Sequence, residues 1–357
     1  MRCVALLCLS LSAAPAAAGP TTYDGKHDLT TINLTVVYFV PKDRTPLPDW
    51  RERVDYYVRR VSAFHARELD GISTIKPNVI PDPVVSDLPA ADFRKGDQNR
   101  TFFDTMNEVK ALIKWKPEKA KGFPCLLVLS DINWRELDDF RRTRVVDGKE
   151  VFEGSIDRTG RHFPGAESGG ARAIYYASPG YGMGLVSGDG WRVPYSGSDC
   201  VVYHEGLGHS LGLPHPDPID DTVMGTAQYK YWINQATLNA AQKRKLGWAP
   251  PATEPDRSRD LFTHFTAVMT PRVPKPGEPV SLALTWPKDA RVKAFTLRYQ
   301  TALGERWTTV KADVNGAPPM AVPLATFDKP TPVSYRVDVT LEDGQAVELW
   351  GYFQVKK

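Results

Sequence analysis

The segment Tyr203–His215, YHEGLGHSLGLPH, constrains this chain more than any other because it holds three histidines within twelve positions. These are His204, His209 and His215, and Glu205 stands directly after the first of them. Zinc takes tetrahedral nitrogen ligands, and a catalytic zinc site keeps three protein ligands and leaves the fourth position to water. The segment therefore predicts three zinc-binding imidazoles with a carboxylate beside the metal.

The first two histidines are five positions apart, whereas the common motif H-E-x-x-H separates them by four. On a regular helix a spacing of four rotates the second side chain by about 40°, and a spacing of five rotates it by about 140°. A local wide turn would absorb the extra residue, and Gly206 and Gly208 lower the steric cost of unusual backbone angles. We therefore predict a π-bulge between His204 and His209.

The second half of the segment has a regular pattern. Gly212 suits a helix end, because its missing Cβ permits the left-handed turn that brings His215 back to the metal. Pro214 cannot continue the helix. Downstream, the run Asp220–Gly225 (DDTVMG) places Met224 in a tight turn, which we expect beneath the metal.

Together these residues resemble the metzincin clan of zinc endopeptidases, and the local sequence is most similar to that of its matrixin-like members. That clan carries H-E-x-x-H-x-x-G-x-x-H followed by a Met-turn. The resemblance implies peptide-bond hydrolysis by a zinc-activated water. It implies these roles: zinc ligands at His204, His209 and His215, the general base at Glu205, the helix-ending glycine at Gly212 and the Met-turn at Met224. The inserted residue is the departure; the same spacing is known in the dipeptidyl-peptidase III family, which nothing else here resembles.

Some metzincins place a tyrosine two residues after the Met-turn methionine. This chain has Tyr229 five residues after Met224, which makes it a candidate to approach the metal or the transition state. The insertion leaves three function classes open. The chain is a secreted zinc endopeptidase, a catalytically impaired, zinc-stabilised extracellular binding or adhesion protein, or a zinc hydrolase of non-peptide amides or esters.

The N-terminus predicts export. Met1-Arg2 precedes an apolar run, and residues 16–18 are three small alanines, which is typical of a secretory signal peptide over residues 1–18. A lipid anchor on Cys8 is the alternative, but Leu7 fits a lipobox poorly. We expect a secreted protein, extracellular or periplasmic, without a membrane span, because no other segment approaches 18 apolar residues. The net charge of +3 does not indicate a nucleic-acid partner.

Two cysteines remain after the signal peptide, Cys125 and Cys200. In an oxidising compartment they could form one disulfide, and two buried thiols are the alternative. Structural calcium among Asp157, Asp189 and their neighbours stays open, although nothing in the sequence indicates it.

The chain is long enough for two domains at 357 residues, and its patterns predict an α/β (α+β) catalytic domain with a mixed sheet over residues 19–250. Strands are expected over 32–40 and 124–130, and helices over 50–70, with Asp49 as N-cap, and over 101–114. Residues 141–198 suggest long loops around a cleft and one edge strand, 171–177. A last helix is expected to run from an N-cap at Thr237 to Lys245.

The C-terminal third has a different pattern. Residues 251–260, with paired prolines and many charges, predict a linker that holds neighbouring domains apart. Beyond residue 261, apolar and polar residues alternate in short runs over 280–286, 295–299, 307–310, 333–341 and 346–353, and Asp343-Gly344 predicts a tight hairpin. This pattern resembles a fibronectin type III or immunoglobulin-like β-sandwich over 261–357. Such a domain could bind protein or glycan surfaces, beside the protein or peptide substrate of the catalytic domain.

Overall fold

The computed structural model describes residues 19–117, 122–134, 142–153, 170–312, 314 and 316–356. Its N-terminal part contains a mixed sheet with the strand order β2-β1-β4-β8-β7, and β3 also pairs with β1. The strands are β1 Thr31–Val40, β2 Thr74–Val79, β3 Val84–Val85, β4 Phe123–Ser130, β7 Ala171–Tyr176 and β8 Tyr181–Val186. All pairs are parallel except β7 with β8. The expected mixed α/β architecture is therefore present, and residues 171–176 form its antiparallel edge strand.

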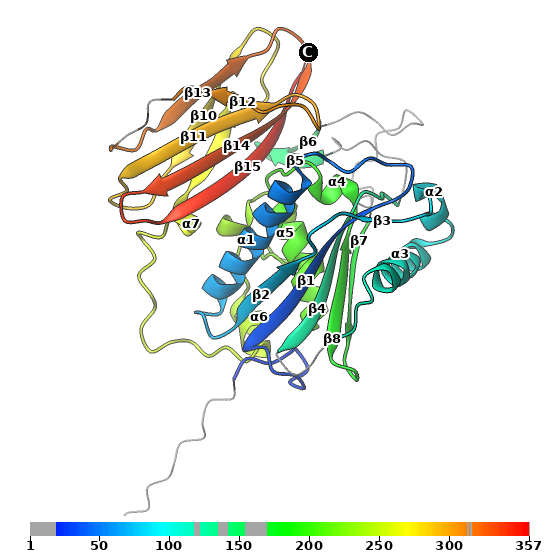
Figure 1. Cartoon of the computed structure of the whole chain (residues 1–357). Helices are drawn as coiled ribbons and strands as arrows, with labels where there is room; N and C mark the ends of the chain where they lie inside the picture. The colour runs from blue at the N-terminus through cyan, green and yellow to red at the C-terminus, as the bar shows by residue number, and fades with distance from the viewer. Residues whose placement is uncertain are drawn as a thin grey trace, which may run out of the picture.

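Both faces of this sheet are buried, which explains the near-continuous apolar runs of β1 and β4. Along β1, residues 32, 34, 36, 38 and 40 point into one core, and Val37 and Phe39 point into another. Helices α1 (Trp50–Glu68) and α5 (Ser198–Tyr203) cover the first face. Helix α3 (Gln98–Leu112) covers the opposite face, beside the short α2 (Ala90–Phe93), as Figure 1 shows.

Helix α1 begins where Asp49 predicts, but the carboxylate of Asp49 does not cap it. It pairs instead with Arg53, with Nε–Oδ1 at 2.9 Å and NH2–Oδ2 at 2.8 Å. Helix α6 (Ala240–Lys245) is the last helix of the N-terminal part, and its N-cap is Asn239, whereas the sequence suggested Thr237. The Asn239 side chain accepts from the Gln242 N–H, and Gln242 reaches back to the Asn239 N–H, which completes a capping box.

Residues 141–198 hold more regular structure than the single edge strand that the sequence suggested. Strand β8 lies inside the sheet between β4 and β7, and β5 (Arg142–Val146) pairs with β6 (Lys149–Glu153) as a separate hairpin. Helix α4 (Gly188–Trp191) follows β8. Residues 1–18, for which a signal peptide is predicted, and Asp157 lie outside the described residues. Among the residues that are described, no helix is long and apolar enough to cross a bilayer.

The C-terminal part consists of two antiparallel sheets with the orders β13-β10-β9 and β12-β11-β14-β15. They share one apolar core, as expected for a β-sandwich. The strands are β9 Thr266–Thr270, β10 Pro279–Thr285, β11 Val292–Gln300, β12 Thr308–Val310, β13 Ala321–Thr326, β14 Thr331–Leu341 and β15 Ala346–Val355. Strands β9 and β13 were not expected from the sequence. The hairpin at Asp343-Gly344 joins β14 to β15, and Gly344 has φ +90°.

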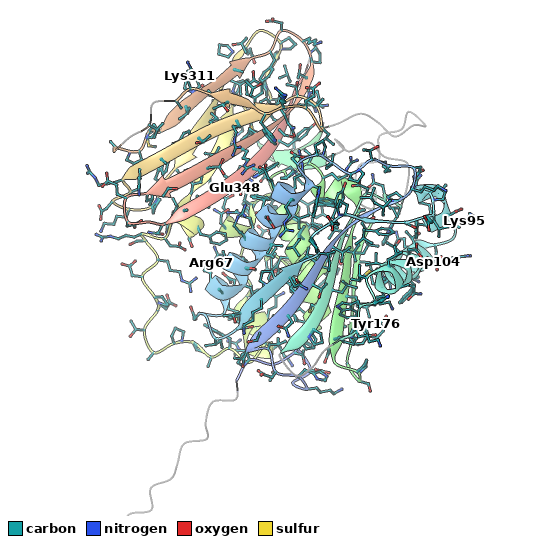
Figure 2. All side chains as sticks on the ribbon, in the orientation of Figure 1. Arg67, Lys95, Asp104, Tyr176, Lys311 and Glu348 are labelled. Atoms are coloured by element: carbon teal, nitrogen blue, oxygen red, sulfur yellow. The ribbon has the colours of Figure 1, made fainter. Side chains whose placement is uncertain are left out.

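Residues 249–260 contain no helix or strand, and the short α7 (Leu261–His264) follows them. Beyond this segment, the C-terminal sheets pack against the N-terminal part. Trp350 of β15 is fully buried in the core of the N-terminal part, with the guanidinium groups of Arg53 and Arg336 each 5.1 Å from its ring centroid. Arg59 of α1 pairs with Glu348, and Figure 2 shows Glu348 on β15 beside α1. The two parts therefore form one continuous packed unit.

Candidate metal centre

The candidate metal centre starts at the C-terminal end of α5. Residues His204–Gly208 form one π-helical turn, in which the His209 N–H donates to the His204 carbonyl five residues back. A short 3-10 turn, His209–Leu211, follows and ends at Gly212, whose φ is +88°. The predicted π-bulge is thus confirmed, and so is the left-handed glycine after it.

The π turn brings three imidazoles to one point. The Nε2 atom of His204 lies 2.9 Å from that of His209 and 3.0 Å from that of His215, and the latter two are 3.2 Å apart. Their possible ligand atoms form the one cluster of three or more histidines, cysteines or acids found among the described residues. His204 is buried, with 3% of its surface exposed, whereas His215 is exposed, so the cluster opens toward solvent.

Backbone carbonyls orient two of these rings. The Val223 carbonyl lies 3.0 Å from Nδ1 of His204, and the Leu213 carbonyl lies 2.6 Å from Nδ1 of His209. Since a carbonyl only accepts, each Nδ1 carries the hydrogen, and each Nε2 presents a lone pair to the shared point. Burial first, and the neighbouring imidazoles second, lower the pKa of His204 to about 3, which keeps its ring neutral.

Three lone pairs at this separation repel one another unless a cation lies between them. Tetrahedral ligands at a zinc–nitrogen distance of about 2.0–2.1 Å are separated by roughly 3.3 Å, close to the observed spacing. The donor set therefore fits a zinc ion. A zinc ion held by these three imidazoles would keep a fourth position for water, as catalytic zinc sites do.

Glycines let the neighbouring segments approach this turn closely. A Cβ on Gly208 would lie 2.2 Å from Sδ of Met224, so Met224 packs directly beneath the π turn. On β8, a Cβ on Gly184 would lie 2.3 Å from the Glu205 carbonyl, and one on Gly182 would lie equally close to the Ser210 carbonyl. The sheet and the turn that carries Met224 therefore clamp the histidine segment from two sides.

Glu205 is only partly exposed, and burial raises the pKa of its carboxyl to about 7 while the positive charge of Arg172 opposes that shift. Arg172 lies on the edge strand β7 and stacks over the ring of Phe102 at 5.6 Å. A carboxyl with a pKa near neutrality can both accept and return a proton. A bound dication would draw this pKa downward.

Tyr229 ends a short 3-10 turn, Ala227–Tyr229, and 51% of its surface is exposed. Burial, followed by the negative charge of Glu205, raises the pKa of its phenol. Tyr229 therefore lies within electrostatic range of Glu205, although no hydrogen bond joins Tyr229 to the histidines or to Glu205 in the structure.

Cys125 and Cys200 are both free and buried, which matches the thiol alternative and not the disulfide. Cys125 lies in the middle of β4, paired across the sheet with Gly182, whereas the Cys200 thiol donates to the Tyr231 carbonyl at 3.5 Å. Asp189 is also buried. It accepts from the Ser187 hydroxyl at 2.7 Å and joins no acidic cluster within the described ranges.

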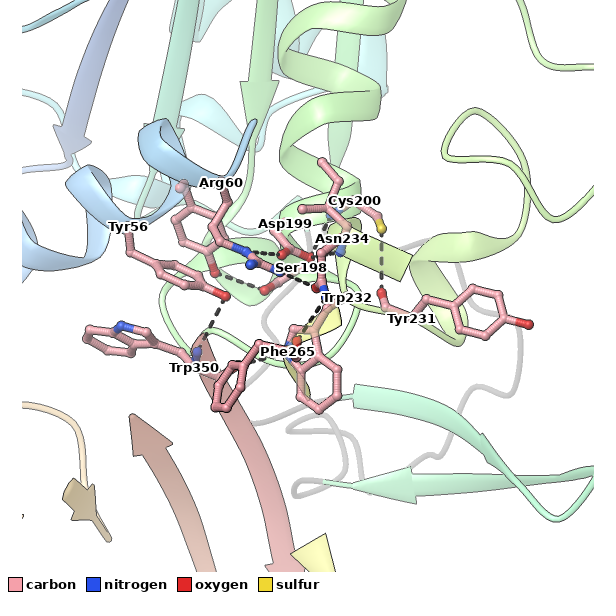
Figure 3. Close-up of polar contacts among 12 residues, drawn as sticks. Tyr56, Arg60, Ser198, Asp199, Cys200, Tyr231, Trp232, Asn234, Phe265 and Trp350 are labelled. Carbon is pink, nitrogen blue, oxygen red and sulfur yellow. Dashed lines mark hydrogen bonds and ion pairs between the residues drawn. The ribbon is translucent and has the colours of Figure 1, made fainter. Parts of the chain in front are cut away.

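The buried network that anchors α5 was not expected from the sequence. The carboxylate of Asp199 accepts from Nε of Arg60 at 3.0 Å and from the Ile233 N–H at 3.0 Å, and Arg60 also donates to Asn234. Figure 3 shows this group between α1 and the segment that follows Met224. One turn later, the hydroxyl of Tyr203 lies 3.1 Å from Nδ1 of His65. Helix α1 carries many other charged residues, so the sequence did not single out Arg60 for this network.

No family model matches the chain, and no curated protein matches it. Among solved structures, catalytically inactive OgpA from Akkermansia muciniphila, in complex with an O-glycopeptide substrate (glycodrosocin), aligns over 96% of this chain and 96% of its own. The identity is 12% and the TM-score is 0.32, a similarity too low to transfer an activity.

Proposed function

We propose that the chain is a zinc-dependent endopeptidase that acts after export. The observation that carries this proposal is the convergence of three Nε2 atoms within 3.2 Å of one another, with Glu205 next to them in sequence and its carboxyl pKa raised to about 7. His204, His209 and His215 would hold the metal. When bound, zinc would supply a Lewis acid that polarises the scissile carbonyl and acidifies water.

The chain's own residues account for the proton transfers. A carboxylate oxygen of Glu205 accepts the proton of the attacking water and then returns it to the leaving amine nitrogen. Val223 and Leu213 keep two imidazoles in the tautomer that presents Nε2, and Met224 supports the turn from below. No nucleophilic side chain is required.

The edge strand β7 favours the proposal that the substrate is a polypeptide and not a small amide or ester. Among the described residues β7 pairs only with β8, so its other edge can pair with an extended peptide backbone. Strand β7 packs against the π turn and the 3-10 turn after it, which would place such a peptide beside the histidines. In this proposal residues 1–18 direct export, residues 19–250 form the catalytic domain and residues 261–357 follow a linker as a β-sandwich domain.

The test compares the zinc-loaded wild type with Glu205→Gln, which keeps the size of the side chain and removes the base. We expect Glu205→Gln to bind zinc at wild-type stoichiometry and to lose about 10²–10⁴-fold in peptide hydrolysis. Glu254→Gln, an exposed substitution in the linker, is the matched control. His204→Ala should lose the zinc itself.

Three results would contradict the proposal. Full activity of zinc-loaded Glu205→Gln would remove Glu205 as the base. A zinc-loaded wild type that cleaves no member of a diverse peptide library would favour a zinc-stabilised binding protein, and cleavage of esters or glycan amides alone would favour the non-peptide hydrolase.

A further inference from the structure

A pocket of about 240 Å³ lies where the segment after Met224 meets the C-terminal sheets. The N-terminal part contributes aromatic side chains, and the C-terminal part contributes two more tyrosines together with Val268 and Met269 of β9. The aromatic residues are Tyr195, Tyr229, Tyr231, Trp232, Tyr335 and Tyr352. Neither part of the chain forms this pocket alone, so the C-terminal sheets contribute side chains to a pocket near the candidate site.

The pocket adjoins the candidate site through Tyr229. The short turn that carries this residue starts three positions after Met224 and packs against α5, the helix that leads into the histidines. A Cβ on Gly197 would lie 1.9 Å from the Gln228 carbonyl, so the loop that carries Tyr195 is also fixed against this turn. The pocket therefore lies beside the turn that follows Met224 and the helix that leads into the histidines.

The charges at the pocket are already neutralised. Lys230 pairs with Asp221 at 2.6 Å, and Arg272 pairs with Asp147 at 2.9 Å. Each cation therefore has a carboxylate partner, so these two pairs add no net positive charge at the pocket. The absence of net charge from these pairs favours an uncharged occupant.

The polar atoms of two lining rings are used inside the protein. The Tyr335 hydroxyl donates to the Ala267 carbonyl at 2.6 Å, and Nε1 of Trp232 donates to the Trp350 carbonyl at 2.8 Å. Figure 3 shows Trp232 beside Trp350 and Phe265. These two rings therefore offer carbon surface rather than donors to the pocket.

The size of the pocket limits what it can hold. Ligand pockets that enclose a whole small molecule usually measure about 300–1,000 Å³, and this one is smaller. We propose that the pocket binds one large, uncharged aromatic or aliphatic side chain of the polypeptide substrate, so that the C-terminal sheets help to choose the cleavage position. This inference rests on the proposed peptidase function, since the side chain belongs to a peptide held at the histidines.

The test uses a peptide series in which one phenylalanine moves through a background of small and polar residues. With the zinc-loaded wild type, one placement should raise kcat/KM by about 10–100-fold over the peptide without phenylalanine, as burial of one aromatic side chain predicts. Gln235→Trp and Ser196→Trp each add a large side chain to the pocket from a partly or fully exposed position. Both should abolish the preference, so that each variant cleaves the phenylalanine peptides and the aromatic-free peptide with similar kcat/KM. Thr309→Trp, exposed on β12, should keep the preference.

Binding to zinc-loaded Glu205→Gln separates this inference from the proposed function. If the wild type cleaves peptides but shows no preference for any phenylalanine placement, or if both pocket variants keep the preference, the pocket assignment is wrong while the peptidase stands. If the wild type cleaves nothing, the assignment still predicts that Glu205→Gln binds one phenylalanine peptide at least tenfold more tightly than the aromatic-free peptide. Equal affinities in that case overturn it.

Discussion

Gly208 tests whether Met224 supports the π turn. The backbone at Gly208, with φ −50° and ψ −61°, accepts alanine without strain, so Gly208→Ala changes only the side-chain contacts. The new Cβ would lie 2.2 Å from Sδ and 2.7 Å from Cε of Met224, far inside the van der Waals contact of about 3.5–4.0 Å. Met224 is fully buried, so its thioether can move only by displacing its neighbours.

Two opposing effects set the magnitude. Alanine in place of glycine stabilises a helical position by about 0.5–1 kcal/mol, whereas overpacking a core costs about 1–3 kcal/mol. We expect Gly208→Ala to lower the free energy of unfolding by about 1–2 kcal/mol in the metal-free protein, measured by urea denaturation. Zinc affinity should fall as well, because the residue before Met224 supplies the carbonyl that holds His204.

A double-mutant cycle identifies the cause. Met224→Ala alone should cost about 2–5 kcal/mol, and the double variant should cost less than the sum because the new methyl group enters the vacated space. Gly206→Ala is the matched control on the same turn, where the nearest atom is the movable Cδ1 of Leu127 at 3.0 Å. A stabilised Gly208→Ala variant, or strictly additive costs in the cycle, would refute the reasoning.

Three further predictions concern the surrounding structure. Burial lowers the pKa of His65 to about 4, below its unfolded value of about 6.5, so unfolding takes up a proton at any pH between these two values. The free energy of unfolding therefore falls as pH drops through this window, by up to about 1.4 kcal/mol per pH unit. Urea denaturation at pH 7 and pH 5 should show a smaller loss of stability in His65→Gln than in the wild type, and equal losses would contradict this. Trp350→Ala should cost about 3–5 kcal/mol and split one calorimetric transition into two, whereas an unchanged single transition would mean that Trp350 does not couple the two parts. Cys125 and Cys200 should react with a thiol reagent only after unfolding, without reductant, and a chain with no titratable thiol would show that a disulfide forms.

The parts of the fold that were predictable are those in which local pattern and tertiary role agree. The β-branched run of β1 predicted a buried strand, and the helical spacing of apolar residues in α1 predicted a helix with one buried face. The Asp343-Gly344 hairpin followed from turn chemistry in the same way. Of the candidate site, the convergence of His204, His209 and His215 and the π turn were predictable, because zinc chemistry restricts both the residue types and the geometry of such a cluster.

The features that the sequence did not predict are those whose residues are determined by contacts with a neighbouring segment. Strand β8 (YGMGLV) contains two glycines and was read as loop, because glycine weakens a strand in isolation. In the folded chain Gly182 and Gly184 leave room for the backbone of the histidine segment, so their value lies in a tertiary contact that no local pattern records. Asp49 was read as a helix cap for the opposite reason: its local position suits a cap, but Arg53 competes successfully for its carboxylate.

The extra residue between His204 and His209 belongs to the same set of contacts. Helix α5 is fixed on its N-terminal side by the buried Asp199–Arg60 pair, and the chain after the turn is fixed by the bond between the His209 ring and the Leu213 carbonyl. With both ends held, an added residue cannot be passed along the helix and must widen the turn in place. That widening is what keeps the two imidazoles on one point, because a regular helix would turn the second ring by about 100° more. A Cβ on Gly184 would lie 2.3 Å from the Glu205 carbonyl, so the backbone of the widened turn is seated directly on β8 of the sheet.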